Sequence, residues 1–260
     1  MKRHWMRLGG DRGGEHLTTI RDEGVGQACV LVHGSPLDQG SWDGLVPLLV
    51  GGRRVVSYDL RGHGSAAGAP SVRSMSDYAD DLAELLDLLG ITRPHLVGHS
   101  FGGQVAQCFA VRFPGRARRL TLLCTRATPY PPFAEAARLL EESGRTEAAP
   151  VIARWFSPEA ITAGAPSVRY AESCLAAADP AVWATTLRMI AAFDGLDELH
   201  RVTAPVRVVG AEHDQVATPE AATRMALAFP HGRLHLLQGA YHCAPLLDPG
   251  PVAALIRDDD

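Results

Sequence analysis

A serine set between two glycines, after an apolar run and before an amphipathic segment, is the feature that most constrains this chain. The run ends at Gly98, Ser100 and Gly102 complete a G-x-S-x-G pattern, and apolar residues recur at helical spacing from Val105 onward. This order predicts a strand, a sharp turn and a helix, with the serine hydroxyl exposed at the helix N-terminus and only small residues tolerated beside it. The same spacing also arises by chance in a chain with 26 glycines, so the motif needs support from the rest of the sequence.

Short apolar runs alternate with amphipathic segments along most of the chain. Besides the run before the serine, runs typical of buried strands lie at 29–32, 54–58, 119–124, 205–210 and 233–237. Segments with helical spacing lie at 42–50, 76–89, 218–229 and from 249 onward. Strands and helices in alternation predict an α/β fold built on a mostly parallel, doubly wound sheet.

This alternation is interrupted between residues 127 and 196. The stretch contains no run typical of a strand, and its alanine-rich helical patterns are broken at Pro150, Pro158, Pro166 and Pro180. A stretch this long without structure is implausible in a compact domain. We therefore predict an all-helical lid at 127–196, inserted into a core formed by 1–126 and 197–260.

The lid is expected to roof the pocket and to set substrate choice. Its bulky residues are too many for a small bundle that stands alone, although about half of them are expected only to fix the lid to the core. These residues are Phe133, Trp155, Phe156, Trp183, Met189 and Phe193.

Composition narrows the classes of function. The net charge is −4 and the arginines are scattered, so no nucleic-acid partner is expected. Because no apolar stretch follows the basic N-terminus, we expect no signal peptide and no membrane span. About the first fifteen residues are expected to be flexible. The five cysteines never occur at C-x-x-C spacing and are interpreted as reduced thiols, which favours a cytoplasmic protein without a metal site.

A serine hydroxyl is a weak nucleophile at neutral pH and needs a histidine base that is oriented by a carboxylate. In an open parallel sheet these groups gather where strands end. Asp214 and His242 follow the last two predicted strands, and serine, acid, histidine is the chain order expected for such a sheet. We predict Ser100 as nucleophile, His242 as base and Asp214 as the orienting acid. Glu212 and Asp59 remain alternatives for the acid. For Asp59 the other interpretation is a carboxylate that stabilises its loop and pairs with Arg61.

Acyl chemistry also requires two N–H donors for the oxyanion. Phe101, directly after the nucleophile, offers one at the helix N-terminus. The second is expected in the turn at 33–36, where Pro36 has no N–H and the main chain of Ser35 is the natural donor. A tight turn without a catalytic role is the alternative for this segment. His99, next to the nucleophile, is expected to pack beneath it.

With these residues in place, the chain resembles the α/β-hydrolase superfamily over nearly its whole length. The matching segments are the H-G-x-P turn at 33–36, the glycine-rich loop at 59–65, the G-x-S-x-G-G elbow at 98–103, the acid segment at 212–214 and His242. The resemblance implies an α/β-hydrolase fold with a catalytic triad and no cofactor. Serine at position 100 separates the chain from the haloalkane dehalogenases and epoxide hydrolases of that superfamily, which have aspartate there.

The lid segments at 154–158 and 170–174 resemble those of the 3-oxoadipate enol-lactonases, which implies a small lactone substrate. Because such lactones are anionic, an arginine is expected to bind the substrate carboxylate. The candidates are Arg154 and Arg126, which follows a predicted strand, and Trp155, beside Arg154, is expected to contact the substrate as well. A surface arginine lying along apolar residues is the alternative for both.

These observations predict a serine hydrolase that cleaves a small lactone or carboxylic ester through an acyl-enzyme on Ser100. The expected partner is this small-molecule substrate, with no membrane and no nucleic acid, and the sequence leaves the oligomeric state open. Hydrolysis of a carbon–carbon bond in a dicarbonyl compound is the first alternative, since it uses the same triad. A ligand-binding protein or cyclase that keeps the fold without hydrolysis is the second.

Overall fold

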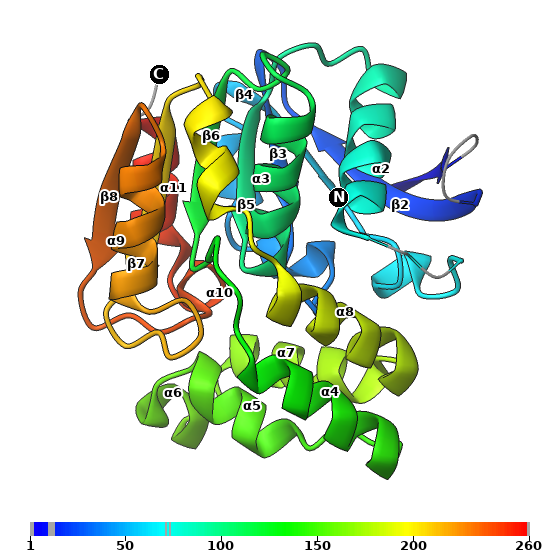
Figure 1. Cartoon of the computed structure of the whole chain (residues 1–260). Coiled ribbons are helices and arrows are strands. Elements are labelled where there is room, and N and C mark those ends of the chain that lie inside the picture. Colours follow the sequence, from blue (N-terminus) through cyan, green and yellow to red (C-terminus); the bar gives the residue numbers. More distant parts are fainter. Residues whose placement is uncertain (1–2, 10–13, 71, 73, 259–260) are drawn as a thin grey trace.

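The computed structural model describes residues 3–9, 14–70, 72 and 74–258, and an eight-stranded sheet forms its centre (Figure 1). The strand order is β1-β2-β4-β3-β5-β6-β7-β8. The strands are β1 (Arg3–Leu8), β2 (His16–Glu23), β3 (Gln27–Val32), β4 (Arg53–Tyr58), β5 (His95–His99), β6 (Arg119–Leu123), β7 (Val206–Ala211) and β8 (Gly232–Leu237). Strands β3 to β8 pair in parallel, while β2 runs antiparallel to β1 and β4. The predicted mostly parallel sheet is confirmed.

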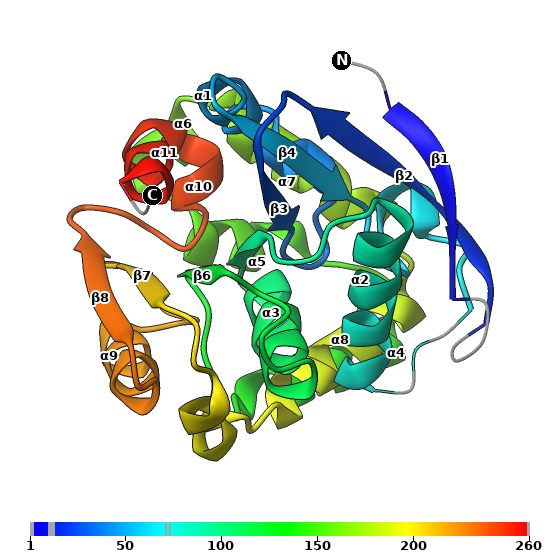
Figure 2. The ribbon, with the colours of Figure 1, turned by 90° about the horizontal axis from the view of Figure 1, so that it is seen from above.

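Helices cover both faces of the sheet (Figure 2). One face carries α2 (Met75–Leu88), α3 (Phe101–Arg112) and α9 (Pro219–Ala228), and the other carries α1 (Val46–Leu49) and α11 (Pro249–Arg257). The connections contain the short 3-10 helices η1 (Gln39–Trp42) and η2 (Gly64–Ala66) and the one-turn helix α10 (Ala244–Leu247). Along β3, Val30 and Val32 join the cluster that holds Phe109, whereas Leu31 joins the cluster that holds Ile256. Because both faces are buried, the strand is a continuous apolar run rather than an alternating one.

The N-terminal segment departs from the expectation of flexibility. Residues 3–8 form β1, which pairs with β2 from Arg3 opposite Arg21 to Leu8 opposite His16. Most β1 side chains are exposed, so the segment lacks the apolar run that marks a buried strand, and antiparallel backbone pairing to the next strand along the chain holds it instead. Residues 1–2 and 10–13, which the same expectation covered, lie outside the described residues.

A layer of helices lies over the C-terminal ends of the parallel strands (Figure 1). The helices are α4 (Pro132–Ser143), α5 (Ala148–Trp155), α6 (Pro158–Thr162), α7 (Pro166–Ala177) and α8 (Pro180–Ala192), and the turn η3 (Leu196–Arg201) leads back to the sheet. Helices α6, α7 and α8 begin at a proline, which suits the first helical position because the N–H it lacks has no partner there. All five helices lie within the segment 127–196 for which a lid is predicted. Leu37 and Cys243 of the core join their apolar cluster.

Candidate active site

Ser100 lies at the sharp turn between β5 and α3. Its backbone has φ 51° and ψ −116°, a region that residues with a side chain rarely adopt. The neighbouring glycines allow the turn to form against the sheet. A Cβ on Gly98 would lie 2.5 Å from the carbonyl oxygen of Gly102, and one on Gly102 would lie 2.2 Å from that of Val32. The turn therefore requires glycine at both positions, as the motif predicts.

The structure brings the predicted triad residues together. His242 Nε2 lies 3.0 Å from Ser100 Oγ, and His242 Nδ1 lies 2.8 Å from Asp214 Oδ2. Asp214 follows β7 and His242 follows β8, so the sheet carries the three side chains to one edge. Since an ionised carboxylate only accepts hydrogen bonds, the proton of the ring is on Nδ1, and Nε2 is free to accept from the serine hydroxyl.

Asp214 is held as a buried carboxylate. Its Oδ1 accepts the N–H groups of Val216 at 2.8 Å and Ala217 at 2.9 Å, while Oδ2 faces His242. Burial alone would raise the pKa of Asp214, but the interactions with His242 and with the two backbone donors outweigh it and lower that pKa. The group is therefore ionised at neutral pH and suited to orient the histidine.

The alternative acids have other partners. Asp59 accepts the N–H groups of Gln39 at 2.8 Å and Ser65 at 2.9 Å, which fixes the loop after β4. The expectation that Asp59, in this loop role, pairs with Arg61 is wrong. Arg61 donates to Asp81 at 2.7 and 2.9 Å instead.

Glu212 also faces away from the histidine. Its Oε2 accepts the N–H of Gly239 at 2.7 Å, which links the loops after β7 and β8. Among the acids weighed for the site, the carboxylate hydrogen-bonded to His242 is that of Asp214.

The turn predicted to supply an oxyanion donor lies against the nucleophile. A Cβ on Gly34 would lie 3.2 Å from Ser100 Cβ, so the turn at 33–36 passes next to the serine. Ser35 lines the same pocket as the nucleophile, and Phe101 is the first residue of α3. Both predicted N–H donors are therefore carried by segments that border the serine side chain.

His63 orients this turn, a role that the sequence did not reveal. Its Nδ1 lies 2.9 Å from the carbonyl oxygen of Arg61, so Nδ1 carries the proton and Nε2 accepts from Ser35 Oγ at 2.9 Å. Burial is the main cause that lowers the pKa of His63 to about 3, which keeps the ring neutral and this arrangement intact. The only signal in the sequence is the position of His63 within the glycine-rich loop at 59–65.

His99 lies beside the triad, as expected. Its Nε2 donates to the carbonyl oxygen of His242 at 3.0 Å, which supports the loop that carries the base. Burial is the main cause that lowers the pKa of His99 to about 3, so this ring too is neutral.

A pocket of about 450 Å³ opens above the triad and is bounded by Ser35, Ser100, His242 and the helices α4, α5 and α8. Trp155 lines it, with its ring centroid 6.3 Å from that of His242. Arg154 also lines it, and its Nε has no hydrogen-bond partner among the described residues. Two of the three predicted substrate-binding residues thus face the space above the nucleophile.

Arg126 does not border this pocket, which corrects the third of these predictions. Its guanidinium donates to the carbonyl oxygens of Thr128, Pro129 and Val216, each at 2.9 Å, and stacks 4.6 Å from the ring centroid of Tyr130. The guanidinium of Arg126, which the sequence predicts to bind an anion, therefore donates to backbone oxygens instead. Because Asp214 binds the N–H of Val216, Arg126 stabilises the loop that positions the acid.

The bulky residues of the lid divide between two tasks. Phe133, Trp155 and Trp183 line the pocket above the nucleophile. Phe156 is buried in the apolar cluster of the lid, and Met189 packs against the core of the sheet. The sequence identified the aromatic residues but not which side of each helix faces the pocket.

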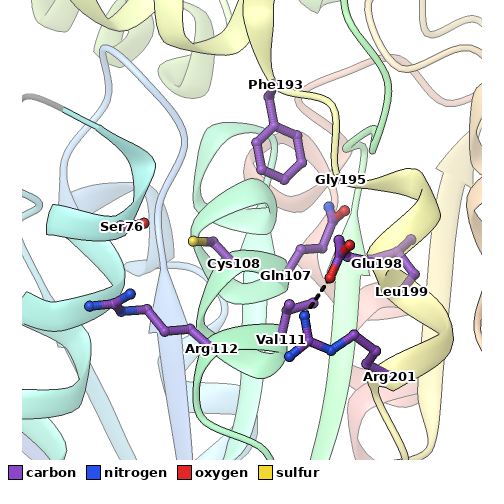
Figure 3. Close-up of a pocket in the computed structure, with 10 residues that line it drawn as sticks. All are labelled: Ser76, Gln107, Cys108, Val111, Arg112, Phe193, Gly195, Glu198, Leu199 and Arg201. Atoms are coloured by element: carbon purple, nitrogen blue, oxygen red, sulfur yellow. Dashed lines mark hydrogen bonds and ion pairs between the residues drawn. The ribbon is translucent and has the colours of Figure 1, made fainter.

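Phe193 lines a different pocket, of about 430 Å³, between α2, α3 and η3 (Figure 3). Its charged groups are paired: Arg112 binds Asp80 at 2.8 Å, and Arg201 binds Glu198. The residues that line it do not overlap with those around Ser100.

The described part of the chain contains no cluster of three or more His, Cys, Asp or Glu side chains arranged to hold a metal ion. None of the five cysteines, all of which lie within these described residues, forms a disulfide bond. No helix within residues 3–9, 14–70, 72 and 74–258 is both long and apolar enough to cross a bilayer.

Several known proteins are similar to this chain in fold or in sequence. A thermophilic esterase from Thermogutta terrifontis matches with a TM-score of 0.88 and 30% identity, covering 99% of this chain and 97% of the esterase. The 3-oxoadipate enol-lactonase 2 of Acinetobacter baylyi is 29% identical over 190 residues, which is 72% of this chain and 71% of that protein. The 2-hydroxy-6-oxo-2,4-heptadienoate hydrolase of Pseudomonas putida is 38% identical over 110 residues, and that match spans only 40% of its length.

The alpha/beta hydrolase family itself matches residues 29–255. That range begins in β3 and ends in α11, so it contains the nucleophile turn, the lid helices, and the loops that carry Asp214 and His242. The fold and the sequence match agree, and this chain belongs to the alpha/beta hydrolase family.

Proposed function

We propose that this chain is a serine hydrolase that cleaves a carboxylic ester or lactone. The observation that supports this most directly is the continuous hydrogen-bond path from Ser100 Oγ through the ring of His242 to Asp214, at 3.0 and 2.8 Å, at the base of an open pocket. Such a path is what an alcohol needs to become a nucleophile at neutral pH.

In the proposed reaction, Ser100 Oγ attacks the ester carbonyl carbon while its proton passes to His242 Nε2. The tetrahedral intermediate carries its negative charge on the former carbonyl oxygen. His242 then returns the proton to the leaving alkoxide as the carbon–oxygen bond breaks, which leaves an acyl group on Ser100. Water attacks this acyl-enzyme with His242 again acting as base, and the acid and free serine are released.

The oxyanion of each intermediate would lie between the main-chain N–H groups of Ser35 and Phe101. Phe101 stands at the N-terminus of α3, where the backbone donors and the helix dipole favour negative charge. The hydrogen bond from Ser35 Oγ to His63 limits the conformations of the turn at 33–36, which carries the other donor. Loss of one such donor lowers kcat by about 10²- to 10³-fold in enzymes of this kind.

Arg154 is the proposed partner for a carboxylate on the substrate, with Trp155 packing against the bound acyl group. Arg154 lines the pocket and has no ion pair among the described residues. An Arg154→Ala variant should lose about 1.5–3 kcal/mol of transition-state stabilisation for a half-ester with a free carboxylate, the worth of a charge-assisted hydrogen bond, and much less for its neutral diester. Equal losses in kcat/KM on both substrates would show that Arg154 only packs against its neighbours.

A second candidate reaction is hydrolysis of a carbon–carbon bond in a dicarbonyl compound. It is favoured by the 38% identity, over 110 residues, to a protein named as a 2-hydroxy-6-oxo-2,4-heptadienoate hydrolase. The same three residues would serve it, so geometry does not separate the two. Comparison of kcat/KM for a lactone, a p-nitrophenyl ester and a vinylogous dicarbonyl acid tests the choice: the ester or lactone should be preferred, and a faster dicarbonyl cleavage would reverse the assignment.

The Ser100→Ala variant tests the proposal as a whole. It should lose about 10⁴- to 10⁶-fold in kcat because the nucleophile and its base act as a unit. Its thermal unfolding should be close to that of the wild type, since Ser100 Oγ is not part of the apolar core. A folded Ser100→Ala protein that retains turnover would contradict Ser100 as the nucleophile, and a wild type that hydrolyses no ester or lactone would make the ligand-binding or cyclase alternative the better account.

A further inference from the structure

The pocket above Ser100 continues between the lid helices as a corridor with an aliphatic wall. We use this name for the part lined by Ala136 and Leu140 of α4, Val151 of α5, and Leu187 and Ile190 of α8. Leu140, Val151, Leu187 and Ile190 are each at most 8% exposed, yet they border the open space of the pocket. The spacing of three or four residues on α4 and α8 places each pair on one helix face.

The corridor leads away from the nucleophile. Its inner end is fixed where the carbonyl oxygen of Trp155, at the end of α5, accepts the N–H of Cys243, next to the catalytic base, at 3.0 Å. Its outer end is at the α4–α5 connection, where the lining residues Arg145, Thr146 and Glu147 are polar. Between Glu147 and Trp155, α5 spans about 12 Å at the usual rise per residue.

We propose that this corridor binds a medium-length aliphatic acyl chain whose ester carbonyl lies at Ser100. The inference rests on the proposed function and adds the class of acyl group. An aliphatic wall gives little directional binding, so its contribution comes from the methylene groups that it removes from water. A small lactone would leave most of this wall uncovered.

The polar outer end fits the same occupant. A chain that runs along α5 has its far end near residues 145–147, where it meets water or a polar side chain. Long side chains in a helix are directed toward the helix N-terminus, so we expect the Arg154 side chain to extend toward this end. A terminal carboxylate is therefore compatible with the corridor, and the aliphatic stretch lies between it and the ester.

A series of p-nitrophenyl esters, from acetate through butyrate and octanoate to palmitate, tests the proposal. In the wild type, kcat/KM should rise by up to about fourfold for each added methylene that becomes buried, and should stop rising once the chain fills the corridor. Octanoate should therefore exceed acetate by at least about tenfold. Equal kcat/KM values for acetate and octanoate would overturn the proposal.

Two variants locate the effect. Ala136→Phe places a ring across the corridor from the half-buried face of α4, and should lower the ratio of octanoate to acetate kcat/KM at least about fivefold. Leu88→Phe is the matched control, since Leu88 is 56% exposed on α2 and far from the lid, and should leave the whole series unchanged. An unchanged ratio in a folded Ala136→Phe protein would contradict the assignment of the corridor.

A binding measurement separates this inference from the proposed function. The Ser100→Ala protein should bind sodium octanoate more tightly than sodium acetate, because the corridor does not depend on the nucleophile. Binding can be monitored by the change in tryptophan fluorescence, since Trp155 and Trp183 line the pocket. If the wild type hydrolyses no ester but this preference holds, the proposed function fails and the corridor stands. If the wild type hydrolyses esters without a preference in rate or binding, the corridor fails and the function stands.

Discussion

Replacing Asp214 by asparagine tests how the site activates its nucleophile. The side chain keeps its size, and the amide oxygen can still accept the N–H groups of Val216 and Ala217 that now bind Oδ1. The amide nitrogen then takes the place of Asp214 Oδ2, which lies 2.8 Å from His242 Nδ1. Because an amide N–H donates, Nδ1 must become the acceptor and the ring proton moves to Nε2, which can no longer accept from Ser100.

The magnitude follows from this change of tautomer. Loss of the base function with the geometry preserved lowers kcat by about 10⁴-fold in triads of this kind, or about 5 kcal/mol in activation free energy. This loss should be smaller than that of Ser100→Ala or His242→Ala, since a fraction of the rings can still adopt the productive orientation. Folding should persist, because both backbone hydrogen bonds to residue 214 remain possible.

Initial rates with a p-nitrophenyl ester, with unfolding followed by circular dichroism, measure both effects. Glu212→Gln is the control and should retain activity, since Glu212 accepts the N–H of Gly239 in the next loop and has no hydrogen bond to His242 among the described residues. Asp59→Asn is expected to disturb the loop after β4 and so to lower stability. A nearly fully active Asp214→Asn protein beside an inactive, folded Asp59→Asn protein would refute the assignment of the acid.

Three further outcomes follow from the structure. The lowered pKa values of His63 and His99 mean that these two residues take up protons in the unfolded chain, but not in the folded protein, as the pH falls below about 6.5, so stability decreases toward about pH 3. Urea unfolding should show a loss of about 2 kcal/mol for each of the two histidines between about pH 7.5 and 5, and His63→Gln should reduce the total loss by about that amount. Arg126→Ala should lower kcat/KM equally for acidic and neutral esters, as it loosens the Asp214 loop, and a selective loss on the acidic ester would restore its role in anion binding. Gly102→Ala should prevent stable folding or cost about 3 kcal/mol or more in unfolding free energy, since its Cβ would lie 2.2 Å from a backbone oxygen, and a melting temperature like that of the wild type would contradict this.

Patterns confined to short segments allowed the core and the positions of the triad residues to be predicted. A parallel sheet places the ends of its strands at one edge, so Asp214 and His242 can be named from the strands before them although 28 residues separate them. The need for glycine at positions 98 and 102 could also be predicted, because the sharp turn at Ser100 leaves room only for small neighbours.

Features that leave no apolar pattern, or that depend on distant contacts, could not be predicted. β1 is of the first kind, because its side chains are mostly exposed and backbone pairing to the next strand, β2, holds it. Arg126 has the right type and a plausible position for binding an anion, but its guanidinium meets the carbonyl oxygen of Val216, 90 residues away. The role of His63 likewise depends on a turn 28 residues earlier.

Covalent labelling of the nucleophile tests the central claim most directly. The folded protein should react with a fluorophosphonate probe, and peptide mass mapping should place a single adduct on Ser100, because only an activated serine attacks this phosphorus. The Ser100→Ala protein should remain unlabelled. A folded wild-type protein that does not react, or an adduct on another residue, would contradict the account of Ser100, His242 and Asp214 as a hydrolytic triad.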